Sequence, residues 1–151
     1  MKHATLLPAA TPWYADGLRW ECQGSGKCCV SHGQMGYVFL SLADRRRLAA
    51  FLELSTSQFT RKYCAKTDDQ WHIRDEPSAA DCRFLVGKRC SVYEARPTQC
   101  RTWPFWPEVM HAKAWQREVA TFCPGVGKGK LWTAEEIGAV LETQSRANQE
   151  R

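Results

Sequence analysis

The sequence predicts a small single domain of the α+β class, in which short helices surround one small β-hairpin. Two kinds of apolar pattern support this class. In some segments apolar residues repeat at helical spacing, and in other, shorter segments apolar and polar residues alternate. A length of 151 residues suits one domain with a modest core. The apolar content of 44% and the charged content of 25% lie in the range of globular proteins.

The first half of the chain predicts two short helices between two strands. Residues 36–40 are aromatic and β-branched, and residues 70–74 alternate, so both favour strands. Between them, Ser41 precedes a helical pattern that has Asp44 in its first turn, and Ser55 starts a second helix in a similar way. The two helices are close enough in sequence to form an αα-hairpin.

The second half of the chain predicts the β-hairpin and two further helices. Residues 82–86 and 89–93 have strand character and are separated by a two-residue turn that contains glycine. Pro97 fixes the backbone at the start of a helix. Residues 112–122 have aromatic and aliphatic side chains at helical spacing, which predicts a longer helix.

The N-terminal and C-terminal parts of the sequence are predicted to be irregular, apart from one helix near the C-terminus. Residues 125–129 are rich in glycine and are predicted to be a link. Thr133 and Glu136 predict the capping box of a last helix, and the polar tail from Gln144 is predicted to fray. The predicted organisation is an irregular segment over 1–19, a cysteine-cluster domain over 20–125, and a C-terminal helix with a polar tail over 126–151.

Eight cysteines are many for a chain of this length. They indicate either a disulfide framework or a set of thiolates that hold a metal. No two of them show the two-residue gap of a zinc ribbon, so a metal site would be assembled from loops across the domain and would stabilise the fold. The cysteines are Cys22, Cys28, Cys29, Cys64, Cys82, Cys90, Cys100 and Cys123.

The compartment expected for this protein favours metal binding over disulfide formation as the role of the cysteines. Pro8 and Pro12 interrupt the first apolar stretch, so we expect neither a secretory signal nor a membrane anchor there. No later stretch approaches the length of a membrane-spanning helix. We therefore expect a cytoplasmic protein, and thiols stay reduced in the cytoplasm.

The charge of the chain does not indicate a nucleic-acid partner. The net charge is +5 and the isoelectric point is about 8.8, but lysines and arginines are scattered. The single basic run, residues 45–47, lies in a predicted helix, where a solvated helix face is the favoured interpretation and a phosphate-binding patch the alternative.

The loop Trp20–Cys29, with the sequence WECQGSGKCC, has the strongest chemical signal. Its glycines allow the backbone to approach a bound group closely, and its N–H groups can donate to sulfur. Cys28 and Cys29 are neighbours, and adjacent thiols point in different directions in most backbone conformations. The pair therefore suits two metals, two atoms of a cluster, or one metal and one outer contact.

The sequence resembles the YkgJ-type cysteine-cluster family, whose members are described as zinc- or iron-chelating domains. The resemblance rests on WECQGSGKCC, CRFLVGKRCSVYEARPTQCRTWPFWP and FCPG, and it covers about residues 20–125. Many members have a further cysteine where this chain has Ser25. Cys64 lies outside the general motif and is either a replacement ligand or a buried thiol. The resemblance implies that the metal-binding set is Cys22, Cys28, Cys29, Cys82, Cys90, Cys100 and Cys123.

The identity of the metal is predicted from the ligands and their surroundings. The chain lacks the compact ligand pairs that zinc prefers, and nearby aromatic residues such as Trp20 and Trp103 could shield a cluster. We therefore favour an iron–sulfur cluster over zinc. His32 could complete a ligand set, although a surface loop histidine is the favoured interpretation. Arg96 and Arg101 flank Cys100 and would either balance a thiolate cluster or form ordinary ion pairs.

The leading functional prediction is a metal-binding protein with a structural or redox role. An enzyme, or an accessory protein for protein modification, is the alternative, because larger relatives of the family include methylases that act on flagellin lysines. The chain contains neither a glycine-rich dinucleotide loop nor a nucleotide phosphate loop. A third interpretation is a zinc-stabilised interaction module. The expected partner is a metal ion or cluster, a protein partner stays open, and a nucleic acid is disfavoured.

Overall fold

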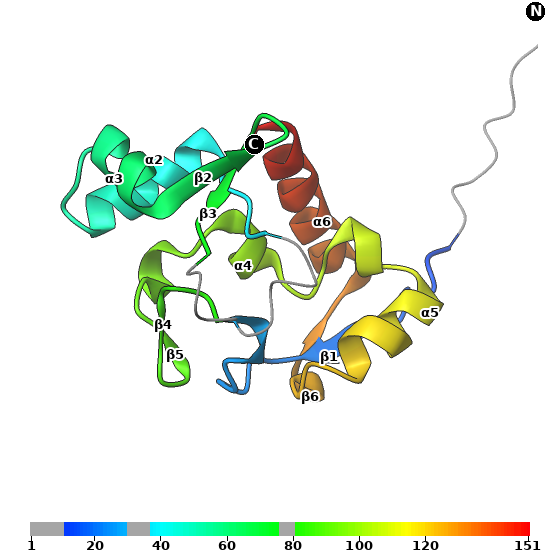
Figure 1. The fold of residues 1–151 in the computed structure, drawn as a ribbon. Coiled ribbons are helices and arrows are strands. Elements are labelled where there is room, and N and C mark those ends of the chain that lie inside the picture. Colours follow the sequence, from blue (N-terminus) through cyan, green and yellow to red (C-terminus); the bar gives the residue numbers. More distant parts are fainter. Residues whose placement is uncertain (1–10, 30–36, 76–80) are drawn as a thin grey trace, which may run out of the picture.

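The computed structural model describes residues 11–29, 37–75 and 81–151, and it confirms the predicted α+β class (Figure 1). Short helices alternate with antiparallel strand pairs along these residues. Each sheet within the described residues contains two strands, so the domain has no large sheet there and its elements are joined by side-chain packing.

The predicted αα-hairpin is confirmed. Helix α2 covers Leu42–Phe51 and helix α3 covers Thr56–Tyr63. The hydroxyl of Ser41 accepts the backbone N–H of Asp44 at 3.1 Å, and the Asp44 carboxylate accepts the backbone N–H of Ser41 at 3.2 Å. Ser55 begins α3 with an equivalent capping box. These boxes satisfy backbone N–H groups that the first helical turn leaves without partners.

A two-stranded sheet follows the helical hairpin. Strand β2 covers Cys64–Thr67 and pairs with strand β3, which covers Gln70–Ile73. The sequence predicted β3 but missed β2. The strand predicted over 36–40 is wrong in extent, because the described part of it forms only an isolated bridge between Phe39 and His72 before the chain turns into α2. Residue 36 lies outside the described residues.

The predicted β-hairpin is confirmed but is shorter than expected. Strand β4 covers Leu85–Val86 and strand β5 covers Arg89–Cys90. A 3₁₀ turn over Tyr93–Ala95 ends the second strand early. Helix α4, Thr98–Thr102, then begins after Pro97, as the sequence predicted. Three cysteines fall in this short stretch of chain, with Cys82 just before β4, Cys90 in β5 and Cys100 in α4.

The N-terminal segment and the glycine-rich link pair with each other, which corrects two predictions. Strand β1, Leu18–Trp20, lies at the end of the segment 1–19 that was predicted to be irregular. Strand β6, Val126–Trp132, includes most of the predicted link over 125–129. The two strands are antiparallel, with a register shift between Arg19 and Trp20. Each strand is stabilised by a partner strand that is distant in sequence. The residues within β1 or within β6 therefore do not indicate a strand by themselves.

The two C-terminal helical predictions are confirmed. A 3₁₀ turn over Pro107–Val109 precedes helix α5, Ala112–Ala114, which continues as a π-helical segment over Trp115–Ala120. Helix α6 covers Ala134–Gln149. Thr133 caps α6, and its hydroxyl accepts the N–H of Glu136 at 3.1 Å.

The predicted fraying from Gln144 is wrong, because the helix continues to Gln149. Gln144 is buried, and its side-chain oxygen accepts the hydroxyl of Thr102 at 2.5 Å. Its side-chain amide donates to Asn148 at 2.8 Å. A buried glutamine that has its hydrogen bonds satisfied fixes the C-terminal turns of α6 against α4.

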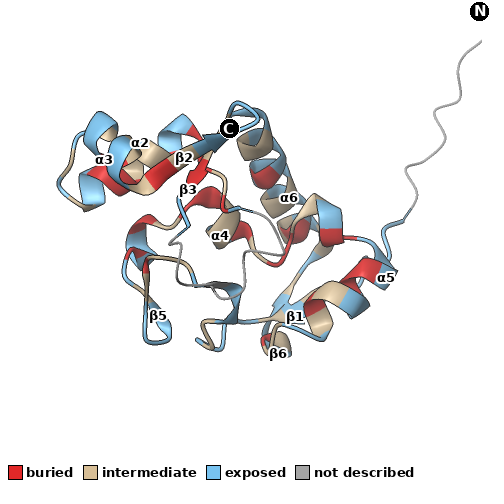
Figure 2. Cartoon of the chain, in the orientation of Figure 1, coloured by how far each residue is buried: buried red, intermediate tan, exposed pale blue. Residues whose placement is uncertain are grey.

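The described residues form two hydrophobic cores. Figure 2 shows that buried residues occur in helices and in the segments that connect them. Cys82, Cys90 and Cys100 pack against the first core, and Cys123 packs against the second. The cysteine segments therefore adjoin both cores. The first core contains Val38, Leu40, Leu48, Ala49, Phe59, Cys64, Ile73, Phe84, Val92 and Ala95, and the second contains Phe105, Val109, Met110, Trp115, Val119 and Ile137.

Candidate metal centre

The first cysteine loop is held against the β-hairpin by a close backbone contact. Cys28 lies in a 3₁₀ turn over Lys27–Cys29. Gly26 precedes this turn with a φ of +72°, and a Cβ at this position would lie 3.1 Å from the carbonyl oxygen of Lys88. A side chain at residue 26 would be strained and crowded. Glycine thus allows the loop to approach the turn between β4 and β5.

This contact helps to gather four thiols that come from four separate segments. Cys28 belongs to the first loop, Cys82 precedes β4, Cys90 ends β5, and Cys100 lies in α4. In every pair among these four thiols, the charge of one thiolate raises the pKa of another member. Cys28 is exposed, while the other three are partly buried. We call these four residues the four-thiol group.

Burial raises the pKa of three members of this group. It is the largest effect on the pKa of Cys82, Cys90 and Cys100, because a thiolate is poorly solvated inside the protein. The positive charge of Arg96 opposes this effect at Cys90 and Cys100, lowering the pKa of each. Of the two arginines that flank Cys100, Arg96 therefore acts on the thiols, whereas Arg101 donates to the hydroxyl of Thr98 at 3.2 Å.

Backbone N–H groups interact with three of the described sulfurs. The N–H of Gly24 donates to Sγ of Cys22 at 3.4 Å. Backbone hydrogen bonds from Phe84 and Val92 likewise lower the pKa of Cys82 and Cys90, respectively. In each case the donor is two residues after the cysteine. Such bonds stabilise a thiolate and tune a bound metal. The sequence predicted such donors in the loop that contains Gly24 but not the donors at Phe84 and Val92.

A small hollow lies beside the four-thiol group. Its volume is about 30 Å³, which is enough for a guest of the size of a water molecule. Cys28 lines this hollow as well as belonging to the four-thiol group, and Cys22 and Cys123 line it with Cys28. The indole N–H of Trp20 donates to Sγ of Cys123 at 3.3 Å. The other lining residues are Gln23, Ser25, Gly26, Lys27, Trp103, Phe122 and Pro124.

Cys64 lies apart from these thiols. Its side chain is 1% exposed and belongs to the first hydrophobic core. Burial raises the pKa of Cys64 to about 11, and the charges that oppose this shift come from arginines, Arg45 foremost. None of the other described cysteines contributes to the shift. The position fits a buried thiol better than a ligand shared with the four-thiol group.

Two candidate ligands cannot be placed in this geometry. The backbone of Cys29 lies in the 3₁₀ turn, but its side chain is outside the description. His32 is outside the described residues. Among the side chains that are described, no three from His, Cys, Asp and Glu already stand close enough to hold an ion. The thiols therefore have to move closer together to share a metal.

The gathered cysteines and the small antiparallel sheets define a class, that of small α+β cysteine-cluster domains. Residues 21–124 match the family described as "CxxCxxCC: Putative zinc- or iron-chelating domain", and the chain belongs to this family. The match confirms the resemblance seen in the sequence and supports zinc or iron as the bound metal. No solved structure matches the chain. Within the described residues, no helix combines the length and the apolar character needed to cross a membrane.

The name of the family spells out a spacing that can be compared with this chain. Counted from Cys22, the four cysteines of the pattern CxxCxxCC fall on Cys22, Ser25, Cys28 and Cys29. Serine thus replaces the second cysteine of the pattern. Ser25 lines the small hollow, where its hydroxyl accepts the backbone N–H of Lys27 at 3.3 Å.

Proposed function

We propose that this domain binds zinc or iron through cysteine thiolates and that the four-thiol group supplies the first ligands. The observation that supports this proposal most directly is the mutual proximity of Cys28, Cys82, Cys90 and Cys100, which come from four separate segments. Soft thiolate ligands are those that zinc and iron–sulfur clusters prefer. Metal binding would then also stabilise the fold, since it joins these segments.

The proposed ligand set extends into the small hollow. Cys22 and Cys123 lie there, and Cys29 follows Cys28 directly. Since adjacent thiols point in different directions, Cys28 and Cys29 can serve the two neighbouring groups together. We leave Cys64 out of the proposed set because it is buried in the first core.

An iron–sulfur cluster is the favoured bound cofactor in this proposal. The thiols come from distant loops, and they form two adjoining groups rather than one compact tetrahedron. Trp103 and Phe122 line the hollow and would exclude water from a cluster. When bound, such a cluster would supply one-electron redox chemistry or a structural link.

The residues of this chain would tune the proposed centre through hydrogen bonds and charge. The backbone N–H groups at Gly24, Phe84 and Val92 would stabilise thiolates after their protons leave. The guanidinium group of Arg96 would offset part of the negative charge of the thiolates at Cys90 and Cys100. Both effects make ionised thiols less costly in a partly buried site.

A reducing compartment, such as the cytoplasm, is part of the proposal. No disulfide joins any two of the cysteines whose side chains are described. Thiols that remain reduced are available for metal binding, whereas an oxidising compartment would convert them to disulfides.

The test is anaerobic purification followed by metal analysis, acid-labile sulfide analysis, and visible and EPR spectroscopy. Iron with acid-labile sulfide and a brown colour would support the cluster. Colourless protein with stoichiometric zinc would keep the thiol site and overturn the preference for iron–sulfur. A fully folded protein that holds neither metal would overturn the proposal as a whole.

A further inference from the structure

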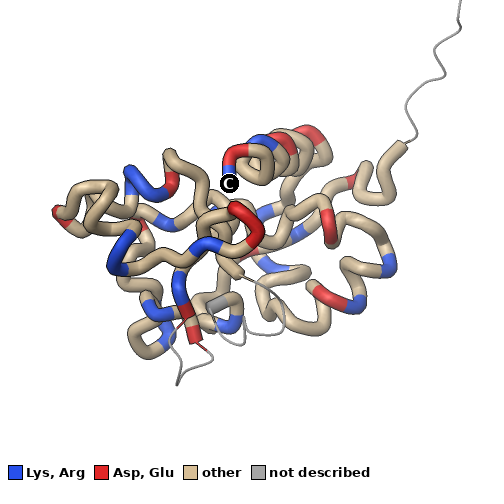
Figure 3. The backbone as a smooth tube through the Cα atoms, turned by 45° about the horizontal axis from the view of Figure 1, so that its top comes forward, with Lys and Arg blue, Asp and Glu red and all other residues tan. Residues whose placement is uncertain are grey.

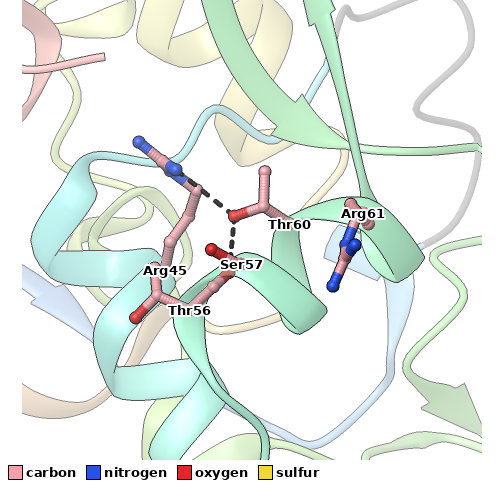
Figure 4. A pocket seen from close by; sticks show the side chains of 5 residues that line it. All are labelled: Arg45, Thr56, Ser57, Thr60 and Arg61. Carbon is pink, nitrogen blue, oxygen red and sulfur yellow. Dashed lines mark hydrogen bonds between the residues drawn. The ribbon is translucent and has the colours of Figure 1, made fainter.

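An open pocket of about 440 Å³ lies between α2 and α3, and no cysteine lines it (Figure 4). Basic and acidic residues are interspersed along much of the chain (Figure 3). The pocket differs from this pattern, because its lining contains two arginines and three hydroxyl side chains but no carboxylate. The lining residues are Arg45, Thr56, Ser57, Thr60 and Arg61.

Arg45 is held in place but has unused donors. Its Nη1 donates to the hydroxyl oxygen of Thr60 at 3.3 Å, and its guanidinium carbon lies 5.1 Å from the centre of the Trp71 ring. The hydroxyl of Thr60 in turn donates to the carbonyl of Thr56 at 2.8 Å. Nε of Arg45 is buried and has no hydrogen-bond partner within the described residues. The side chain is therefore fixed by its neighbours, and the donors within reach of a ligand in the pocket are those at the end of the guanidinium group, because Nε is out of contact with solvent.

The positive charge at the pocket is not balanced by a neighbouring carboxylate. Within the described part of the chain, neither Arg45 nor Arg61 forms an ion pair. Arg47, on the same helix as Arg45, provides a contrast because it pairs with the carboxylate of Asp44 at 2.6 Å. Two unpaired guanidinium groups at one pocket favour an anionic ligand.

We infer that this pocket binds the phosphate group of a small phosphomonoester. Arginine presents N–H donors in a fork that matches phosphate oxygens, and the exposed hydroxyl of Ser57 adds a further donor. The volume of about 440 Å³ falls within the range of small-molecule sites, so it leaves room for an organic group beside the phosphate. This site is separate from the proposed metal centre and adds a second ligand to its function.

The experiment is isothermal titration calorimetry, which measures ligand binding to the full-length, metal-loaded protein at constant ionic strength. The probes are O-phosphoserine, inorganic phosphate and serine. Saturable one-to-one binding of O-phosphoserine, with no binding of serine, is expected. Binding of inorganic phosphate with equal affinity would support the phosphate site and identify the free anion as a sufficient ligand. Absence of binding by both phosphate probes at millimolar concentration would overturn the inference.

Three arginine variants locate the binding. Arg61→Gln removes an exposed charge from the pocket, and Arg45→Gln removes the guanidinium group that is held by Thr60. Each should weaken phosphate binding by about tenfold or more, as expected when a charge-assisted hydrogen bond is lost. Arg46→Gln is the matched control, since Arg46 is exposed on α2 and does not line the pocket.

The outcome of these variants separates the pocket from other phosphate-binding groups. If Arg46→Gln weakens binding as much as Arg61→Gln, the effect is one of net charge and the pocket assignment is wrong. Unchanged binding in Arg61→Gln, with the fold confirmed by circular dichroism, would likewise contradict it. Direct coordination of phosphate to the metal predicts that none of the three variants matters.

Discussion

The indole N–H of Trp20 donates to Sγ of Cys123 at 3.3 Å, although 103 positions separate the two residues. Trp20 is the last residue of β1, and Cys123 lies just before β6. The pairing of these two strands therefore sets the position of a proposed metal ligand. The same tryptophan ring packs near Phe105, so its hydrogen bond and its place in the second core are linked.

Trp20→Phe tests whether this hydrogen bond supports metal binding. Phenylalanine keeps an aromatic ring but removes the donor to Cys123. Metal affinity should fall by about tenfold, in the range that follows from loss of an outer-shell partner. Competition with a chelator measures the change. Trp13→Phe is the control because the indole of Trp13 donates to the carbonyl of Met110 and not to a thiol. Equal losses in the two variants would contradict a specific role for Trp20.

Gly125→Ala tests the close approach of the first loop to the segment after Cys123. A Cβ at residue 125 would lie 2.3 Å from the carbonyl oxygen of Glu21, so the two backbones would have to separate. We expect the free energy of unfolding to fall by about 1–3 kcal/mol, as for other overpacked sites, and the bound metal to be lost more readily. Thermal denaturation and chelator competition measure the two effects.

The control for this substitution is Gly138→Ala in α6. A Cβ at residue 138 would meet no heavy atom within 4 Å apart from its chain neighbours and the nearby backbone of its own helix. Because alanine favours helix over glycine, this variant should gain about 0.5–1 kcal/mol of stability without a change in metal affinity. A stable, fully metal-binding Gly125→Ala protein would show that the backbone contact at Glu21 is unimportant.

Ser25→Cys tests the replacement of one cysteine in the family pattern. A thiol at residue 25 would join Cys22, Cys28 and Cys123 at the small hollow. Metal should then be retained more strongly, and we expect a gain in affinity of about tenfold, or 1.4 kcal/mol, for one added soft ligand. Ser145→Cys adds an exposed thiol on α6 and serves as the control. An unchanged affinity in Ser25→Cys would place residue 25 outside the coordination sphere.

Cys64 predicts a specific dependence of stability on pH. Burial raises the pKa of its thiol to about 11 from an ordinary value of 9.0. Between these values the folded chain keeps a proton that the unfolded chain has released, so the folded state loses stability as the pH rises. The contribution is complete below pH 9 and is lost as the pH approaches 11.

Chemical denaturation of metal-loaded protein across this pH range measures the effect. The free energy of unfolding of the wild-type protein should fall more steeply with pH than that of Cys64→Ala. Other groups also titrate in this range, but they are common to both proteins and cancel in the difference. Parallel curves would show that Cys64 does not keep its proton in the folded state.

Local signals in the sequence predicted the helix starts, and non-local contacts account for most of the errors. Ser41, Ser55 and Thr133 are followed within three residues by the groups that complete their capping boxes. Strands β1 and β6 depend on partners at opposite ends of the chain, so no short window contains their signal. The burial of Gln144 depends on Thr102 in the same way.

The candidate site shows the same division between local and non-local information. The residue type and the family resemblance indicated which cysteines could hold a metal. Only the folded chain reveals that Cys28 adjoins both thiol groups and that Cys64 is buried in the first core. The pocket at Arg45 and Arg61 was hidden because its arginines belong to different helices, and the basic run at residues 45–47 was interpreted as a solvated surface.

The most direct test of the account compares the metal content of Cys100→Ala with that of Cys64→Ala, both prepared anaerobically. Each change removes one thiol that packs in or against the first core, but only Cys100 belongs to the four-thiol group. We predict that Cys100→Ala loses most of its bound zinc or iron and that Cys64→Ala keeps the wild-type amount. Full metal content in Cys100→Ala, or an equal loss in both variants, would contradict the proposed centre.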